Sequence, residues 1–353
     1  MGMDTYRIDQ KNGMELGIYT LGDHFPNPHT GARISAQQRI NEIIEMAKLT
    51  EQAGLDIFSV GESHQEYFTT QAHTVVLSAI AQATKRIKIA SSSSIISTSD
   101  PVRVYEDFST IDLISDGRAE IVAGRASRVG LFDLLGYDLR DYEELFEEKF
   151  DLLLQINKNK ILNWEGNHRA PLVNAEVLPR PKNGSLPIWR AVGGSPGGAI
   201  RAGLQGVPMY LATLGGPASS FKESVDAYRN ALRHNDYDPA DFPVTIAGWF
   251  YAAEDSQTAM REIYPFLNEG MKLANGTGMS KQAFAYGADV RSVQNVGSPQ
   301  QIIEKILYQY ENFNHQRYIA QMDFGGVPHD KLMKNIELFG DIIAPAIRKY
   351  TRI

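Results

Sequence analysis

Short apolar runs alternate with longer amphipathic segments along the whole sequence, and the alternation recurs eight times. Most of the apolar runs are continuous rather than alternating, which is typical of parallel strands that are covered on both faces. They span residues 15–20, 56–60, 87–91, 119–123, 187–191, 207–212, 245–251 and 317–322. Eight strands separated by helices predict a (β/α)8 barrel, the TIM barrel, as a single domain over residues 1–353.

The segments between the apolar runs have helical periodicity and recognisable ends. The first begins with the capping box Ser35-x-x-Gln38 and stops at Gly54. Others span 72–83, 101–114, 142–156, 196–204, 219–233 and 256–273, with two more after Ser298 and over about 330–350. In the last of these we expect Pro345 to bend the helix or to fix its last turn.

The chain exceeds a usual barrel by about 100 residues, which indicates long insertions at strand ends. The surplus lies in residues 21–34, 61–71, 124–140, 158–186 and 270–298. The last segment is rich in glycine, so we expect either a mobile lid over the site or an exposed insertion. An open doubly wound sheet is the alternative fold, but the first strand is not followed by the Gly-x-Gly-x-x-Gly that it needs.

The composition excludes several classes of function. The chain has no cysteine, so thiol catalysis, disulfides and metal–thiolate sites are excluded. Its net charge is −7 without any basic block, which argues against binding to nucleic acid or to acidic membranes. No membrane span or signal peptide is apparent, so we expect a cytoplasmic protein. No lysine, His-x-His or carboxylate pair follows a predicted strand, so neither a Schiff-base enzyme nor a metal site is expected.

Two predicted strands end in polar residues, at the end of an α/β barrel that carries the chemistry. Glu62 and His64 follow the second strand. They either pair with each other as structural residues or place an imidazole that moves protons in a pocket. Ser92 and Ser93 follow the third strand and form either a polar strand end or the lining of a planar ligand.

Two further strand ends together indicate a phosphate site. Arg125 follows the fourth strand, and an arginine there suits phosphate, with a carboxylate such as Asp133 as the alternative partner. After the fifth strand, a glycine-rich turn leads into a helix, where backbone N–H groups and the helix N-terminus favour an anion. The residues of this turn that we expect to contribute are Gly193, Gly194, Ser195, Gly197 and Gly198.

The stretch from Asp100 to Arg125 reads DPVRVYEDFSTIDLISDGRAEIVAGR. It strongly resembles the bacterial luciferase-like flavin monooxygenase family, in which Pro-Val-Arg, Asp-x-x-Ser-x-Gly-Arg and a Gly/Cys-Arg pair recur at this spacing. The segments 296–300 (VGSPQ) and 325–328 (GGVP) also fit, so the resemblance runs from about Met14 to Tyr350. Gly124 stands where luciferase α-type chains have a cysteine, so light emission is not implied.

The resemblance implies a role for each candidate residue. The flavin phosphate would lie on Arg125 and the 193–198 turn, where Gly198 replaces one of the family's hydroxyl residues. The flavin ring would lie on the Ser92–Ser93 segment, whose peptide bond is often cis in the family. The Glu62 and His64 side chains would be catalytic, with the histidine beside the reactive edge of the flavin.

The resemblance also implies a reaction and partners. The chain would be a monooxygenase that uses reduced FMN and O2 to oxidise a small-to-medium, apolar organic substrate. A separate NAD(P)H:flavin reductase would deliver the reduced FMN, and a homodimer is expected. The mouth of the pocket is expected to be lined by Tyr67, Phe68, Leu131 and Phe132. The alternatives are an oxidoreductase that uses the deazaflavin F420, and a barrel that binds flavin or another phosphate ligand without turnover.

Overall fold

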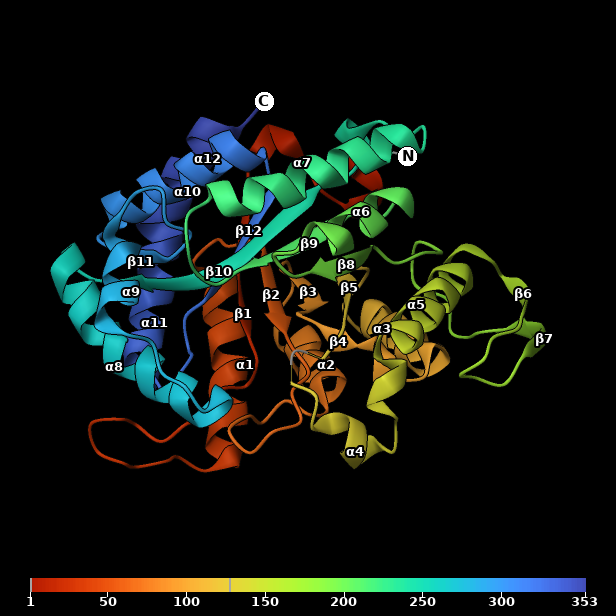
Figure 1. The fold of residues 1–353 in the computed structure, drawn as a ribbon, viewed down its shortest axis with the longest axis horizontal. Coiled ribbons are helices and arrows are strands. Elements are labelled where there is room, and N and C mark those ends of the chain that lie inside the picture. The colour runs from red at the N-terminus through yellow and green to blue at the C-terminus, as the bar shows by residue number, and fades with distance from the viewer. Residues whose placement is uncertain (1, 127) are drawn as a thin grey trace.

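A closed barrel of eight parallel strands forms the centre of the computed structural model, which describes residues 2–126 and 128–353 (Figure 1). The strands are β1 (Glu15–Thr20), β2 (Ile57–Val60), β3 (Lys88–Ser91), β5 (Ala119–Gly124), β8 (Ile188–Val192), β9 (Met209–Thr213), β10 (Val244–Ala252) and β12 (Arg317–Gln321). The barrel closes because β1 pairs in parallel with both β2 and β12. The predicted TIM barrel is therefore confirmed, and every predicted strand is present.

Helices surround the barrel and cover its strands (Figure 1). They are α1 (Ala36–Gln52), α2 (His73–Ala83), α3 (Pro101–Ile114), α5 (Tyr142–Lys158), α6 (Pro196–Leu204), α7 (Ser219–His234), α8 (Ser256–Asn275), α10 (Pro299–Phe313), α11 (His329–Leu338) and α12 (Ala344–Thr351). The predicted starts are confirmed by capping bonds, since the Ser35 and Ser298 hydroxyls accept from the backbone N–H groups of Gln38 and Gln301.

The single helix predicted over 330–350 is interrupted. A π-helical segment (Phe339–Ile343) separates α11 from α12, and Pro345 lies in the first turn of α12, where a missing N–H leaves no hydrogen bond unmade. Within the π-helical segment, a side chain on Gly340 would clash with the carbonyl oxygen of Ala53. The glycine therefore lets this helix approach the end of α1 closely.

The insertions contain small elements of their own. A hairpin of β6 (Ile161–Trp164) and β7 (Leu172–Glu176) projects beyond α5 at the right edge of Figure 1. The others are β4 (Ser94–Ile95), β11 (Asn295–Gly297), α4 (Leu131–Leu135), α9 (Lys281–Ala285) and the 3-10 turns Met3–Tyr6, Gln10–Asn12, Ile96–Thr98, Leu139–Asp141, Pro239–Asp241 and Tyr286–Ala288. Within the described residues, no helix is both long enough and apolar enough to cross a membrane.

A buried ion-pair network fills the amino-terminal end of the barrel. The Arg317 guanidinium donates to both Glu120 carboxylate oxygens, at 2.8 and 3.1 Å, and through Nε to Glu15 at 2.8 Å. Trp189 Nε1 donates to Glu120 at 2.9 Å, and Lys88 contacts Glu15. Burial raises the pKa of Glu120, but the charges of Arg317, Lys88 and Arg7, together with the Arg317 hydrogen bonds, outweigh burial and leave that pKa below its usual value. The network joins the starts of five strands, β1, β3, β5, β8 and β12.

We expect Glu120→Gln to lower the free energy of unfolding by about 3 kcal/mol, because the substitution breaks a buried ion pair and leaves Arg317 with Glu15 as its remaining carboxylate. Denaturant titration at pH 7 measures this change. Glu106→Gln is the matched control, since Glu106 pairs with the exposed Arg103, and it should change stability by less than about 0.5 kcal/mol.

The same pair makes a prediction in acid. The folded state holds the pKa of Glu120 below the unfolded value of about 4.3. Its contribution to stability is therefore complete above that pH and is lost as the pH falls through the folded pKa. The Glu120→Gln protein should lose less stability than wild type between pH 5 and 3. Parallel pH profiles, or wild-type stability at pH 7, would contradict this role.

Candidate active site

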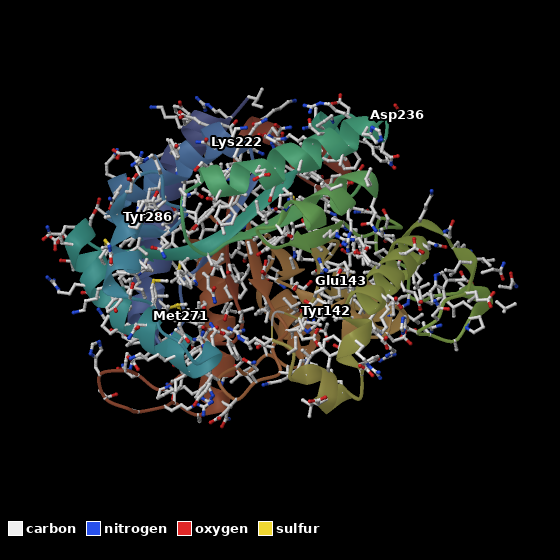
Figure 2. The ribbon with its side chains drawn as sticks, viewed as in Figure 1. Tyr142, Glu143, Lys222, Asp236, Met271 and Tyr286 are labelled. Carbon is white, nitrogen blue, oxygen red and sulfur yellow. The ribbon has the colours of Figure 1, made fainter. Side chains whose placement is uncertain are left out.

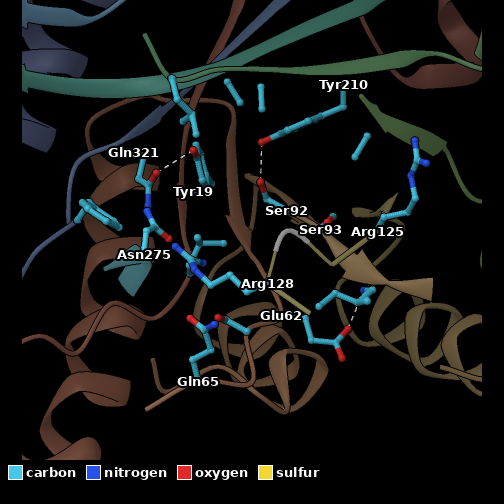
Figure 3. Close-up of a pocket in the computed structure, with 18 of the residues that line it drawn as sticks. Tyr19, Glu62, Gln65, Ser92, Ser93, Arg125, Arg128, Tyr210, Asn275 and Gln321 are labelled. Atoms are coloured by element: carbon cyan, nitrogen blue, oxygen red, sulfur yellow. Dashed lines mark hydrogen bonds between the residues drawn. The ribbon is translucent and has the colours of Figure 1, made fainter. Parts of the chain in front are cut away.

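A cavity of about 450 Å³ lies at the carboxyl ends of the barrel strands (Figure 3). Its size is within the range of small-molecule sites, about 300–1,000 Å³. Its lining is Tyr19, Leu21, Glu62, Ser63, His64, Gln65, Ser92, Ser93, Ile95, Arg125, Arg128, Leu131, Ala191, Val192, Tyr210, Ala212, Leu214, Ala247, Trp249, Met271, Asn275, Met279, Gln321 and Phe324. Half of these residues are apolar, and the polar ones come mainly from the ends of different strands and the loops that follow them.

Glu62 and His64 line this cavity and also bind each other. His64 Nε2 lies 2.7 Å from Glu62 Oε1, while Glu62 Oε2 accepts from the backbone N–H of Ile95 at 2.7 Å. The two interpretations from the sequence are thus compatible, because a paired imidazole also faces the cavity. His73, which the sequence did not single out, lies behind Glu62 with its Nδ1 3.9 Å from Oε2. Burial lowers the pKa of His73, so this imidazole is neutral.

The Ser92–Ser93 segment lies in the cavity wall, and its peptide bond is cis, as predicted. The Ser92 hydroxyl is 2.5 Å from the Tyr210 hydroxyl (Figure 3). Two glycines give the segment room: a side chain on Gly61 would clash with the Ser92 carbonyl, and one on Gly124 would clash with the Ser93 hydroxyl. The glycine at position 124, in place of a cysteine, is therefore a packing requirement of this chain.

Arg125 also lines the cavity, but its carboxylate partner is not Asp133. The guanidinium binds the Glu143 carboxylate, and Glu143 also accepts from Arg201 of α6 at 3.0 Å. Glu143 and Tyr142 are adjacent at the start of α5 (Figure 2). The Arg125 guanidinium lies 5.9 Å from the centre of the Tyr142 ring. The Glu143 side chain is 54% exposed, so this pair stands at the edge of the cavity where an incoming anion can reach it.

The glycine-rich turn stands at the rim of the cavity rather than inside it. None of Gly193, Gly194, Ser195, Gly197 and Gly198 belongs to the lining, although Val192 just before them does. Arg125 Nη2 lies 3.8 Å from the position that a Cβ on Gly198 would occupy, so the turn and the arginine are neighbours. Space is open around Gly193 and Gly197, and the Ser195 hydroxyl makes no capping bond to α6.

The expected pocket mouth was wrong in three of its four residues. Leu131 lines the cavity, but Phe68 and Phe132 are buried in the core, 3% and 1% exposed, and Tyr67 stacks on Phe25. These three aromatic side chains bury their apolar surface against other parts of the protein instead of lining the cavity.

Trp249 belongs to the buried core, at 7% exposed, and also lines the cavity. Sequence reasoning also missed Arg128 and the polar residues Tyr19, Gln65, Asn275 and Gln321. Arg128 lies three residues beyond Arg125 in the same strand-end loop, which was the available signal. Within the described part of the chain, no group of three histidine or acidic side chains is placed to hold a metal ion.

Solved structures share this fold, and three of them illustrate the range. Monooxygenase RslO1 from Streptomyces bottropensis has a TM-score of 0.81 at 21% identity, covering 94% of this chain and 99% of its own. The oxygenating constituent of 3,6-diketocamphane monooxygenase from Pseudomonas putida, solved with FMN, has a TM-score of 0.76 at 16% identity, covering 94% and 98%. An F420-dependent secondary alcohol dehydrogenase, solved with an F420-acetone adduct, has a TM-score of 0.72 at 16% identity, covering 95% and 99%.

Family membership rests on a different comparison, because identities this low show the fold alone. The family model described as luciferase-like monooxygenase matches residues 14–315, which is most of the chain and includes every barrel strand except β12. Together with the barrel and the residues at its strand ends, this match places the protein: it belongs to the luciferase-like monooxygenase family.

Proposed function

We propose that this protein is a flavin-dependent monooxygenase that uses reduced FMN and O2 to oxidise a small-to-medium organic substrate. One observation carries the proposal. Arg125 and the amino terminus of α6 adjoin a largely apolar cavity that also contains the Glu62–His64 pair and the Ser92–Ser93 segment.

The residues present fit the phosphate of FMN. Arg125 is at the cavity edge, the Ser195 hydroxyl is free of any capping bond, and open space around Gly193 and Gly197 leaves their backbone accessible. A guanidinium, a hydroxyl and N–H groups at a helix N-terminus are the donors that bind phosphate. We therefore assign the phosphate to Arg125, Ser195 and the backbone of the 193–198 turn.

The cavity wall also fits a planar ring. Gly61 and Gly124 bring the Ser92–Ser93 backbone close to the barrel, and Tyr210 holds the Ser92 hydroxyl. Burial raises the pKa of Tyr210, so this phenol stays protonated and can donate. We assign the flavin ring to Ser92 and Ser93, with the substrate in the remaining apolar space.

When bound, reduced flavin would supply the electrons for the reaction with O2. The side chains of the protein would exclude water and hold a proton. Because the Glu62 carboxylate accepts from His64 Nε2, the proton on this imidazole lies at Nε2, and Nδ1 is the atom left to exchange a proton with reactants. Glu62 in turn is held by the Ile95 N–H, so His64 is the catalytic residue and Glu62 orients it.

We also propose a partner, a location and an oligomeric state for the protein. A separate NAD(P)H:flavin reductase would supply reduced FMN, and we propose a cytoplasmic homodimer. Met271, Asn275 and Met279 reach the cavity from the end of α8 and the segment after it. Segment 270–298 is accordingly proposed to be a mobile lid that closes over the bound flavin.

An F420-dependent oxidoreductase is the second candidate, favoured by the solved F420-dependent dehydrogenase of the same fold. Titration of the purified protein with FMN, FAD and F420, oxidised and reduced, separates the two by flavin fluorescence and absorbance. FMN selectivity supports the proposal, and F420 selectivity replaces it. If the protein binds flavin but does not couple flavin reoxidation to the formation of a product, it is a non-catalytic flavin-binding barrel.

Two substitutions should change FMN affinity in opposite directions. Arg125→Ala should weaken FMN binding by about 1.5–3 kcal/mol, because it removes a charged donor to the phosphate. Glu143→Gln should strengthen it, because the Glu143 carboxylate competes with the phosphate for Arg125. Fluorescence titration with FMN and with riboflavin checks both, since riboflavin lacks the phosphate. Equal effects on the two flavins would place the phosphate elsewhere.

His64→Gln should leave FMN affinity unchanged and slow the reoxidation of bound reduced FMN by O2 by about 10²-fold or more, because proton transfer loses its imidazole. Stopped-flow absorbance after mixing with oxygenated buffer measures this rate. His168→Gln is the matched control, because His168 also lies close to a glutamate, Glu144, but does not line the cavity. A wild-type rate in His64→Gln would remove His64 from the mechanism.

A further inference from the structure

Arg128 brings a second guanidinium into the cavity, apart from Arg125. In Figure 3, Arg125 lies beyond Ser93 on one side, and Arg128 reaches the region of Asn275 and Gln65 on the other. Among the described residues no hydrogen bond or ion pair within 4 Å holds Arg128, and its Nε is buried without a partner. A buried donor without an acceptor is unfavourable, and an acceptor on a ligand would satisfy it.

Among the described residues, no ion pair within 4 Å compensates the charge of Arg128. Asp23 is the acidic group that attracts it, but Asp23 is 2% exposed and lies near a second buried carboxylate, Asp323. Asp323 is held by the Arg39 guanidinium and the Thr20 hydroxyl, whereas no side chain donates a hydrogen bond to Asp23 among the described residues. Burial and the charge of Asp323 raise the pKa of Asp23 well above its usual value. Both influences favour the protonated form of Asp23, so this carboxyl offsets the charge of Arg128 less than an exposed carboxylate would.

The surroundings of Arg128 suit an acid with an apolar body. Its guanidinium lies 4.8 Å from the centre of the Phe68 ring, and the aromatic contacts continue through Phe25 to Phe324, which lines the cavity. Among the described lining residues, Glu62 is the one carboxylate, and it is already engaged with His64. An incoming carboxylate at Arg128 thus meets a cation, neutral amides and aromatic surface.

We propose that Arg128 is the substrate's carboxylate receptor, so that the molecule oxidised here is an organic acid with an apolar body. The planar guanidinium matches a carboxylate through two parallel N–H···O bonds. The cavity then has two cationic ends, with Arg125 for the cofactor phosphate and Arg128 for the substrate. The acid's apolar body occupies the apolar space left beside the flavin, in a cavity that Leu21 and Trp249 help to line. The inference rests on the proposed function for its chemistry, whereas binding of the acid can be tested separately.

The test compares two probes with the same alkyl chain, the anionic octanoate and the neutral octanamide. Isothermal titration calorimetry measures their affinities for the wild-type protein, Arg128→Gln, Arg128→Lys and the control Arg140→Gln, whose arginine is exposed and pairs with Asp138. Wild type should bind octanoate at least about tenfold more tightly than octanamide. Arg128→Gln should lose that preference and keep its octanamide affinity. Arg128→Lys should retain part of the preference, and Arg140→Gln all of it.

Other outcomes overturn the proposal. They are equal affinity of wild type for the two probes, no binding of either, a preference that survives in Arg128→Gln, or loss of both probes in that variant, which would show a packing role. FMN affinity is measured in parallel. A loss of FMN binding in Arg128→Gln would place this arginine at the cofactor and also overturn the proposal. Failure of wild type to bind any flavin would instead overturn the proposed function and leave the carboxylate preference standing.

Discussion

The buried pairing of Arg317 with Glu120 is the interaction on which the rest of the architecture depends. It connects the starts of strands that are far apart in sequence, so it forms only when the barrel has closed in the observed register. Two charges that would be costly alone in the interior satisfy each other, with Trp189, Glu15 and Lys88 completing the set. This end of the barrel is thereby occupied, and the opposite end is left for chemistry.

At that opposite end, the geometry of the cavity wall depends on two glycines, which have no side chain. Gly61 and Gly124 lie on either side of the Ser92–Ser93 segment, and both approach it more closely than a Cβ would allow. The strand ends can therefore carry a flat wall next to the paired Glu62 and His64. Larger residues at either position would displace the backbone that we assign to the flavin ring.

Much of the fold was predictable from the sequence because periodicity and capping act locally. The eight apolar runs and the caps at Ser35 and Ser298 were each visible within a few residues of sequence. The pairing of Arg125 with Glu143 was not, since the partner is 18 positions away on a helix face that no local pattern marks. The interruption at 339–343 likewise lies where the helix packs against the end of α1, a contact that no local pattern marks.

The same distinction holds in the cavity. Residues at strand ends were found because the barrel topology brings strand ends together, as for Glu62, His64, Ser92 and Ser93. The positions of the aromatic residues in the insertions were predicted wrongly. From sequence alone, Tyr67, Phe68 and Phe132 could either line a cavity or pack against other side chains, and only tertiary packing determines which. The position of the Arg128 side chain in the cavity depends on the orientation of a loop, which secondary-structure propensity does not determine.

The pairing of Arg125 with Glu143 has a consequence for how a flavin would be exchanged. The arginine assigned to the phosphate is already paired with a surface carboxylate, Glu143, which it shares with Arg201. An arriving cofactor phosphate would therefore replace one anion with another at Arg125. The carboxylate can return as the phosphate leaves, which limits the net gain on binding. A site built this way suits a flavin that comes and goes with every catalytic cycle, as a co-substrate passed from another protein must.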